Sequence, residues 1–126
     1  MRVLIVRHAE AAPGEPDELR PLTVEGQEHA RALGELLRAD GFAPHAVVTS
    51  PLLRAVQTAN ALGLGEPEVD DRLAPGASPA DLRDAAEGRG DPVVVVGHQP
   101  DCGRAVLELT GADVPFPPAG CYEVEL

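Results

Sequence analysis

Lysine and tryptophan are absent from this sequence of 126 residues, and aromatic side chains make up only 2% of it. A chain with so few rings must build its core from Val, Leu, Ile and Ala. All ten basic residues are arginines. A phosphate-binding site in this chain therefore has to draw its positive charge from arginine or histidine.

Further shortages narrow the class of protein. No apolar run is long enough to cross a membrane, and the first one is too short for a signal peptide, so we expect a cytoplasmic protein with no membrane partner. The net charge of −11 argues against a basic face for nucleic acid. The two cysteines, Cys102 and Cys121, form no CxxC pair, so a zinc site has little support and we expect no metal.

Alternating strand-like and helix-like segments predict a layered α/β fold with a mainly parallel sheet. The length and an apolar share of 44% predict one domain, residues 1–126, which we expect to be monomeric. We expect parallel strands at 2–6, 46–49 and 93–96, an antiparallel edge strand at 121–126, and loops at 11–21 and 63–77. We expect helices from the capping residue Thr23 to about 40, after the cap Ser50-Pro51, from Ser78-Pro79 to about 87, and from Pro100 to near Gly111.

Polar side chains stand where three of these strands end. Arg7 and His8 follow the first strand, and Ser50 follows the second, with Arg54 one helical turn further on. His98 follows the strand at 93–96. Because the carboxyl ends of parallel strands meet at one edge of a sheet, we expect both arginines and both histidines to converge on one small anion.

The residue types of this cluster suit phosphate chemistry. A guanidinium group matches two phosphate oxygens at once, and a neutral imidazole is a competent nucleophile toward phosphorus. A histidine that attacks phosphorus must be neutral, whereas a protonated histidine can stabilise the anion. We expect Arg54 to share with Gln57 and Thr58 the face of its helix opposite the apolar one.

Four motifs in the same order resemble those of the histidine phosphatase superfamily, also called the phosphoglycerate mutase-like family. Together they cover nearly the whole chain. The short length of the chain and the Arg-Pro-Leu-Thr sequence of the second motif are most similar to those of the SixA-type phosphohistidine phosphatases. The motifs are Arg7-His8-Ala9-Glu10, Arg20-Pro21-Leu22-Thr23-Val24-Glu25-Gly26, Ser50-Pro51-Leu52-Leu53-Arg54-Ala55-Val56-Gln57-Thr58-Ala59 and Gly97-His98-Gln99-Pro100.

The resemblance implies a three-layer α/β/α sandwich and a phosphatase that needs no metal and no organic cofactor. It implies that His8 is the nucleophile and is transiently phosphorylated, while Arg7, Arg54 and His98 complete the phosphate pocket. In these roles His8 must be neutral to attack, and we expect His98 to act protonated as a stabiliser of the anion. Arg20 is implied at the mouth of the pocket. The chain departs from the family at Ala9, where a glycine is usual.

A general acid is harder to find. Glu10 is the first candidate, with Asp71 and Asp101 behind it, although each fits a solvated loop acid better. An alcohol leaving group needs such a proton donor. Imidazole leaves more readily, because its conjugate acid has a pKa of about 6.5. The missing acid therefore favours phosphohistidine over a sugar phosphate as the substrate.

Three functions remain open at this point. The leading hypothesis is a phosphatase that removes phosphate from phosphohistidine in a protein through a phosphohistidine enzyme intermediate. The second is a small-molecule phosphomonoesterase or a phosphoglycerate mutase-like enzyme, although a mutase needs a closing lid that residues 63–77 are too short to supply. The third is a non-catalytic module that recognises phosphate.

Overall fold

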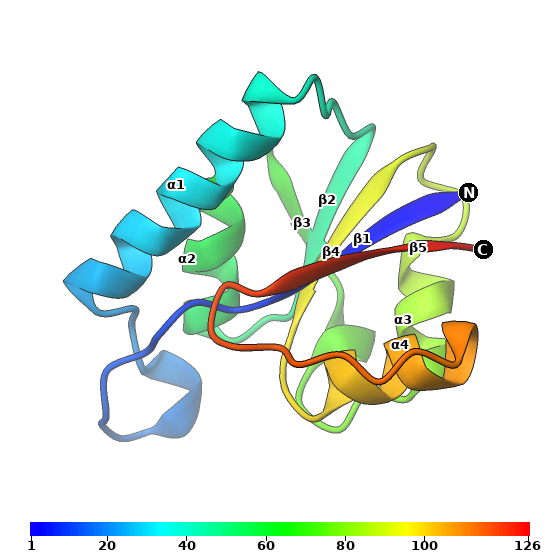
Figure 1. Ribbon diagram of the computed structural model, residues 1–126. Coiled ribbons are helices and arrows are strands. Elements are labelled where there is room, and N and C mark those ends of the chain that lie inside the picture. The colour runs from blue at the N-terminus through cyan, green and yellow to red at the C-terminus, as the bar shows by residue number, and fades with distance from the viewer.

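Five strands form the central sheet, in the order β3-β2-β4-β1-β5, in the computed structural model, which describes residues 1–126 (Figure 1). Neighbouring strands run parallel, except that β5 is antiparallel to β1. The mainly parallel sheet and the antiparallel edge strand were both predicted from the sequence. The strands are β1 (Arg2–Arg7), β2 (Ala46–Thr49), β3 (Pro67–Val69), β4 (Val93–Gly97) and β5 (Cys121–Glu125).

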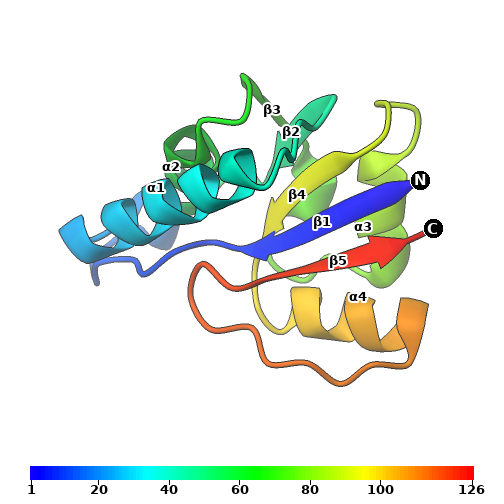
Figure 2. The same cartoon turned by 45° about the horizontal axis from the view of Figure 1, so that its top comes forward.

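Four helices cover the two faces of the sheet and complete the three-layer sandwich. Figure 2 shows α1 (Val24–Ala39) and α2 (Leu53–Leu62) on one face and α3 (Pro79–Ala86) and α4 (Asp101–Thr110) on the other. Successive residues of β1 alternate between the faces: Leu4 and Val6 pack in the α2 cluster, and Val3 and Ile5 in the α3–α4 cluster. Both faces of the central strands are buried, which explains why β1 and β4 are continuous apolar runs.

Two of the predicted helix starts are confirmed. Thr23 caps α1, because its Oγ1 accepts a hydrogen bond of 2.9 Å from the backbone N–H of Gly26. Ser78 and Asp81 form a reciprocal capping box at the start of α3, with Pro79 in its first turn. Each start lies directly after a loop, so the caps fix where the chain turns back toward the sheet.

The predicted start of α2 is wrong. Ser50 and Pro51 precede the helix, which begins at Leu53 with Leu52 in the capping position. Ser50 Oγ instead accepts a hydrogen bond of 3.2 Å from the N–H of Leu52 and bends the chain before the helix begins. Arg54 and Thr58, expected on the face away from the core, are both buried in the structure.

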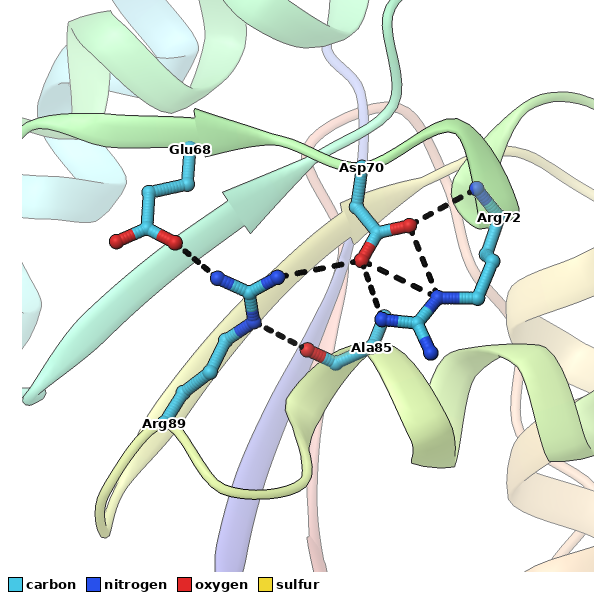
Figure 3. Close-up of polar contacts among 5 residues, drawn as sticks. All are labelled: Glu68, Asp70, Arg72, Ala85 and Arg89. Carbon is cyan, nitrogen blue, oxygen red and sulfur yellow. Dashed lines mark hydrogen bonds and ion pairs between the residues drawn. The ribbon is translucent and has the colours of Figure 1, made fainter.

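The predicted loop at 63–77 contains β3 and a short 3₁₀ turn, η2 (Asp71–Leu73). Two of the acidic side chains here, Glu68 and Asp70, are partners in an ionic network (Figure 3). Asp70 accepts hydrogen bonds from Arg72 and Arg89, and Arg89 also pairs with Glu68 and donates to the carbonyl of Ala85 in α3. The network ties the edge strand β3 to the end of α3.

Glycine lets α1 approach its neighbours closely. A Cβ on Gly26 would overlap the carbonyl oxygen of Glu10, and one on Gly34 would overlap the carbonyl oxygen of Leu62 at the end of α2. The helix therefore rests against the chain that leaves β1 and against α2. No helix of the protein combines the length and apolar character that crossing a membrane requires.

Candidate active site

The two histidines of the strand-end motifs lie side by side at the carboxyl edge of the sheet. β1 and β4 are neighbours, with Arg7 opposite Gly97, and the N–H of His8 donates to the carbonyl of Gly97 at 3.0 Å. The ring centroids of His8 and His98 are 5.2 Å apart, with the ring planes inclined at 59°. The sheet register thus brings together two residues that are ninety positions apart in the chain.

The backbone fixes the protonation pattern of His8. Its Nδ1 lies 2.7 Å from the carbonyl oxygen of Ala9, which can only accept, so Nδ1 carries the proton. Burial lowers the pKa of His8 below 6.5; the hydrogen bond to Ala9 opposes this shift, and the charges of Arg54 and Arg7 add to it. At neutral pH the ring is therefore uncharged and its Nε2 carries a free electron pair.

His98 is held by a serine. Its Nε2 lies 2.8 Å from Ser50 Oγ, and both residues are buried. Burial, followed by the nearby His8 and Arg54, lowers the pKa of His98 to about 4. This pKa favours a neutral ring, because a cationic neighbour and low solvation both disfavour a charged one, and a protonated His98 beside a bound anion stays a prediction.

Arg7 is anchored by the segment that leads into β5. Its Nη1 donates to the carbonyl of Phe116 at 2.9 Å, and its backbone N–H donates to Gly120. The Nε of Arg7 is buried and has no hydrogen-bond partner. An unpaired buried donor on a charged group is costly, so this N–H is available to an anion at the site.

Arg54 and Arg20 meet at one acidic residue, Asp17, in the 3₁₀ turn η1 (Asp17–Leu19). Nη1 of Arg54 donates to the Asp17 carbonyl at 2.9 Å and Nη2 to Oδ2 at 3.2 Å, while Nη1 of Arg20 donates to Oδ1 at 2.9 Å. These pairs, with Arg20 contributing most, lower the pKa of Asp17. Sequence reasoning missed Asp17, although an acid three residues before an arginine in a short turn is a known pairing signal.

Thr58 connects α2 to the residue after the candidate nucleophile. Its Oγ1 accepts from the N–H of Ala9 at 3.0 Å and donates to the carbonyl of Arg54 at 2.8 Å. The Ala9 methyl group is fully buried and packs with Leu22 and Ala30. The alanine that replaces the family's usual glycine therefore has a place in the structure.

Of the three candidate proton donors, Glu10 and Asp101 accept hydrogen bonds from other parts of the protein, and Asp71 accepts none. Glu10 is exposed and accepts from the Thr23 hydroxyl at 2.9 Å beside the cap of α1. The buried Asp101 accepts from the backbone N–H groups of Gly76 and Ala77, which makes it a structural carboxylate. Asp71 is exposed and makes no side-chain hydrogen bond, so a proton-donating role for Glu10 or Asp71 stays a prediction.

The one pocket found in the protein lies away from the rings of His8 and His98. It has a volume of about 360 Å³ and lies between α1 and α2, lined by Gln27, Arg31, Gln57, Asn60 and Ala61. No group of three or more His, Cys, Asp or Glu side chains is placed to hold a metal ion. The charged groups that the structure gathers near the imidazoles are thus arginines and Asp17, in a site without an enclosing cavity.

Comparison with known proteins identifies relatives of this arrangement. The chain is 34% identical over 125 residues to the phosphohistidine phosphatase SixA of Escherichia coli K12, which covers 91% of this chain and 78% of that protein. It is also 37% identical over 115 residues to an uncharacterised protein of Picosynechococcus, which covers 82% of this chain and 70% of that protein.

Solved structures agree. The structure of the protein histidine phosphatase SixA complexed with tungstate matches with a TM-score of 0.89 and 30% identity, covering 100% of this chain and 88% of that one. The crystal structure of the putative phosphohistidine phosphatase SixA from Agrobacterium tumefaciens matches with a TM-score of 0.84 and 26% identity, covering 97% and 89%. Residues 3–77 match the model of the histidine phosphatase superfamily (branch 1). The chain therefore belongs to the histidine phosphatase superfamily.

Proposed function

We propose that this protein removes phosphate from phosphohistidine in a protein substrate, through a phosphorylated His8 and without a metal ion. That it is a phosphatase follows from its family and from its likeness to SixA. The observation that carries the finer proposal is the state of His8. Its Nδ1–H is fixed on Ala9 and its pKa is lowered, so Nε2 is left free to attack beside the second imidazole, His98.

Arginine supplies the charge for binding the phosphoryl group. Arg7 and Arg54 flank the imidazoles closely enough for their charges to lower the pKa of both rings. A phosphoryl oxygen would give the buried Nε of Arg7 the partner it lacks. Arg20 reaches the same region through Asp17 and would contact the anion at the mouth.

The transfer step needs little from the missing acid. The electron pair on Nε2 of His8 forms a bond to phosphorus as the phosphorus–nitrogen bond of the substrate breaks. The departing imidazole keeps that bond's electron pair and leaves neutral, because its other ring nitrogen has already taken a proton from water. Arginine N–H groups, with an N–H of the neutral His98, stabilise the charge on the transferring group.

Hydrolysis of the intermediate regenerates the enzyme. A water oxygen attacks phosphorus, the bond to Nε2 of His8 breaks, and its electron pair returns to the ring. The proton of the water passes to the departing phosphate or to solvent. The carbonyl of Ala9 holds Nδ1–H throughout, so the ring returns to the state in which it can attack again.

Two observations favour a protein-borne phosphohistidine over a small phosphate ester. Asp101, the only buried carboxylate, is committed to structural hydrogen bonds, and Glu10 and Asp71 are exposed, so protonation of an alkoxide is poorly provided for. The pocket between α1 and α2 also lies away from the imidazoles and does not enclose them, as a metabolite site would. The free thiols of Cys102 and Cys121 suit the reducing cytoplasm, where we place the protein.

We test this with a radiolabelled phosphohistidine peptide, mixed briefly with enzyme and quenched in alkali, which preserves phosphohistidine. We expect label on His8 in the wild type and neither label nor turnover in His8→Ala. His29→Ala, an exposed histidine on α1, is the matched control and should behave as wild type. Full turnover by His8→Ala would overturn the assignment of the nucleophile.

Substrate class is tested separately with the same preparation. We expect kcat/KM for the phosphohistidine peptide to exceed that for a phosphoglycerate by about a hundredfold or more, because only the ester needs a strong proton donor. Comparable values would favour the small-molecule esterase instead. Binding of the peptide without any hydrolysis would favour a non-catalytic recognition module.

A further inference from the structure

One acidic residue orients the two arginines that lie beyond the strand ends. Asp17 uses both carboxylate oxygens and its carbonyl oxygen to accept three hydrogen bonds from the guanidinium groups of Arg20 and Arg54. The guanidinium of Arg54 makes no other hydrogen bond in the protein. Asp17 therefore accepts every hydrogen bond that orients this buried group within the protein.

We propose that Asp17 is a positioning residue for phosphoryl binding, which acts by holding Arg54 and Arg20 in the orientation that receives the anion. The proposal rests on the proposed function, because it assumes that these arginines bind a phosphoryl group. Asp17 itself would not touch the substrate, since a carboxylate and a phosphoryl dianion repel each other.

The geometry favours orientation over competition with the anion. The contacts with Asp17 occupy one N–H on Nη1 and one on Nη2 of Arg54, and they leave Nε and one N–H on each terminal nitrogen free. A fork of two donors therefore remains on Arg54 for phosphate oxygens. The carbonyl of Asp17 also accepts from the N–H of Arg20 at 3.2 Å within the turn, so it stays in place when an anion binds.

The loop that carries Asp17 is itself held in position. Its base is closed by the bridge between Ala11 and Leu22 and by the hydrogen bond from Ala12 to Pro21. Leu22 N–H donates to Gln57 Oε1 on α2 at 2.7 Å, and Nε of Arg20 donates to the carbonyl of Ala12. Asp17 is thus fixed to the helix that carries Arg54 and can serve as a rigid reference point.

Charge alone and orientation make opposite predictions when Asp17 is removed. Removing a carboxylate near an anion site strengthens anion binding by simple electrostatics. Removing the only hydrogen-bond partner of Arg54 lets its guanidinium adopt other orientations. Anion binding is then weaker, because ordering the Arg54 side chain on association costs free energy. The sign of the change separates the two effects.

The experiment measures binding of the tungstate dianion by titration calorimetry to the wild type and to Asp17→Ala, Asp17→Asn, Glu18→Ala and Arg54→Ala. We expect Asp17→Ala to bind tungstate about tenfold more weakly, with a smaller loss in Asp17→Asn, which keeps one acceptor oxygen. Glu18→Ala is the matched control, because it removes the same charge from the next exposed position, whose side chain makes no hydrogen bond or ion pair. It should bind as tightly as the wild type or more tightly.

Kinetics with the phosphohistidine peptide provide a second readout. Asp17→Ala should raise KM more than it lowers kcat, and Asp17→Asn should recover part of the loss. Unchanged or tighter tungstate binding by Asp17→Ala overturns the proposal, as does an equal loss in Glu18→Ala. If Arg54→Ala loses binding while Asp17→Ala does not, the proposed function stands and only the role of Asp17 fails; if the wild type does not bind tungstate, both fail.

Discussion

The ring centroids of His8 and His98 lie 5.2 Å apart, and burial lowers the pKa of both rings. His8 is also one cause of the low pKa of His98. The pair therefore enters the reaction uncharged, and the positive charge that an anion meets comes from arginine. This division of roles leads to the first prediction.

Both rings should titrate below the ordinary histidine pKa of 6.5, with His98 at about 4. Nuclear magnetic resonance of the histidine Cε1–H groups measures this, with signals assigned from His8→Ala and His98→Ala. In His8→Ala the pKa of His98 should rise, because the effect of the His8 ring on the protonation of His98 is removed and solvent enters. A wild-type His98 that titrates at 6.5 or above would contradict the prediction.

These shifts have a consequence for stability. Below 6.5 the unfolded chain takes up protons on these histidines that the folded protein does not, so folding stability falls as the pH falls from 6.5 toward 4. Urea unfolding at a series of pH values measures the slope. His98→Gln should flatten it in this window.

Removal of the Ser50 hydroxyl should impair catalysis more than folding. Ser50→Ala takes away the partner of His98 Nε2 and the acceptor for Leu52 N–H, so the orientation of the ring is lost. We expect kcat to fall by about tenfold or more, as measured with the phosphohistidine peptide.

Ser78→Ala is the matched control for Ser50→Ala, because Ser78 also precedes a proline but caps α3. It should lower the free energy of unfolding by about 1 kcal/mol and leave kcat unchanged. Equal losses of kcat in the two variants would mean that Ser50 has no special role at His98.

Asp70→Asn should destabilise the edge of the sheet. The pKa of Asp70 is lowered from 3.8 to about 2 (Figure 3). The side-chain hydrogen bonds from Arg72 contribute most, followed by the hydrogen bond from the backbone N–H of Arg72 and by the charges of Arg72 and Arg89. We expect a loss of about 2 kcal/mol in the free energy of unfolding, because the carboxylate is only 9% exposed and charge-assisted hydrogen bonds are lost.

The sign of the pH dependence follows from the direction of that shift. The stabilisation by Asp70 is fully present above 3.8 and is lost as the pH falls toward 2. Denaturant unfolding of wild type and Asp70→Asn should therefore converge in acid. Asp71→Asn, whose side chain makes no hydrogen bond, is the control and should match wild type at every pH.

Gly34→Ala should destabilise the packing of α1 on α2. The added methyl group would overlap the carbonyl of Leu62, and backbone cannot move aside as a side chain can. We expect a loss of about 1–3 kcal/mol in the free energy of unfolding, as is usual for overpacking.

Gly103→Ala in α4 is the control for Gly34→Ala. Its Cβ would meet the amide of Gln99 at 3.3 Å, which accepts from the Gly103 N–H and must shift slightly. The gain in helix propensity offsets this cost, so the free energy of unfolding should change by less than about 1 kcal/mol. Thermal unfolding measures both variants. A tolerated Gly34→Ala would show that α1 can shift away from α2.

The sequence predicted the elements whose signals are local and strong. The apolar runs of β1 and β4, the cap at Thr23 and the Ser78-Pro79 start of α3 lie where expected. The strand β3 was missed because three residues that begin with Pro67 and include an exposed acid lack a periodic pattern. Its pairing with β2 exists only in the assembled sheet.

The site was predicted correctly for residues that follow buried strands. It was not predicted where a side chain finds its hydrogen-bond partner in a distant segment of the chain. The adjacency of His8 and His98 follows from parallel strands that meet at one edge. The same serine-proline pattern has different outcomes at Ser78 and Ser50, because Ser50 faces a buried imidazole whose position depends on β4. Asp17 was missed for the same reason, since its partner Arg54 is distant in the chain.

The register of β1 also governs when the site can form. β1 pairs with β4 on one side and with β5 on the other, and Arg7 depends on the carbonyl of Phe116. During synthesis, β1 can form sheet hydrogen bonds on one edge only after β4 has been made, and on the other only after β5. Both pairings are contacts of very high sequence separation. A ribosome-bound chain that has already made His8, Arg54 and His98 should thus remain without activity until the segment around Phe116 emerges.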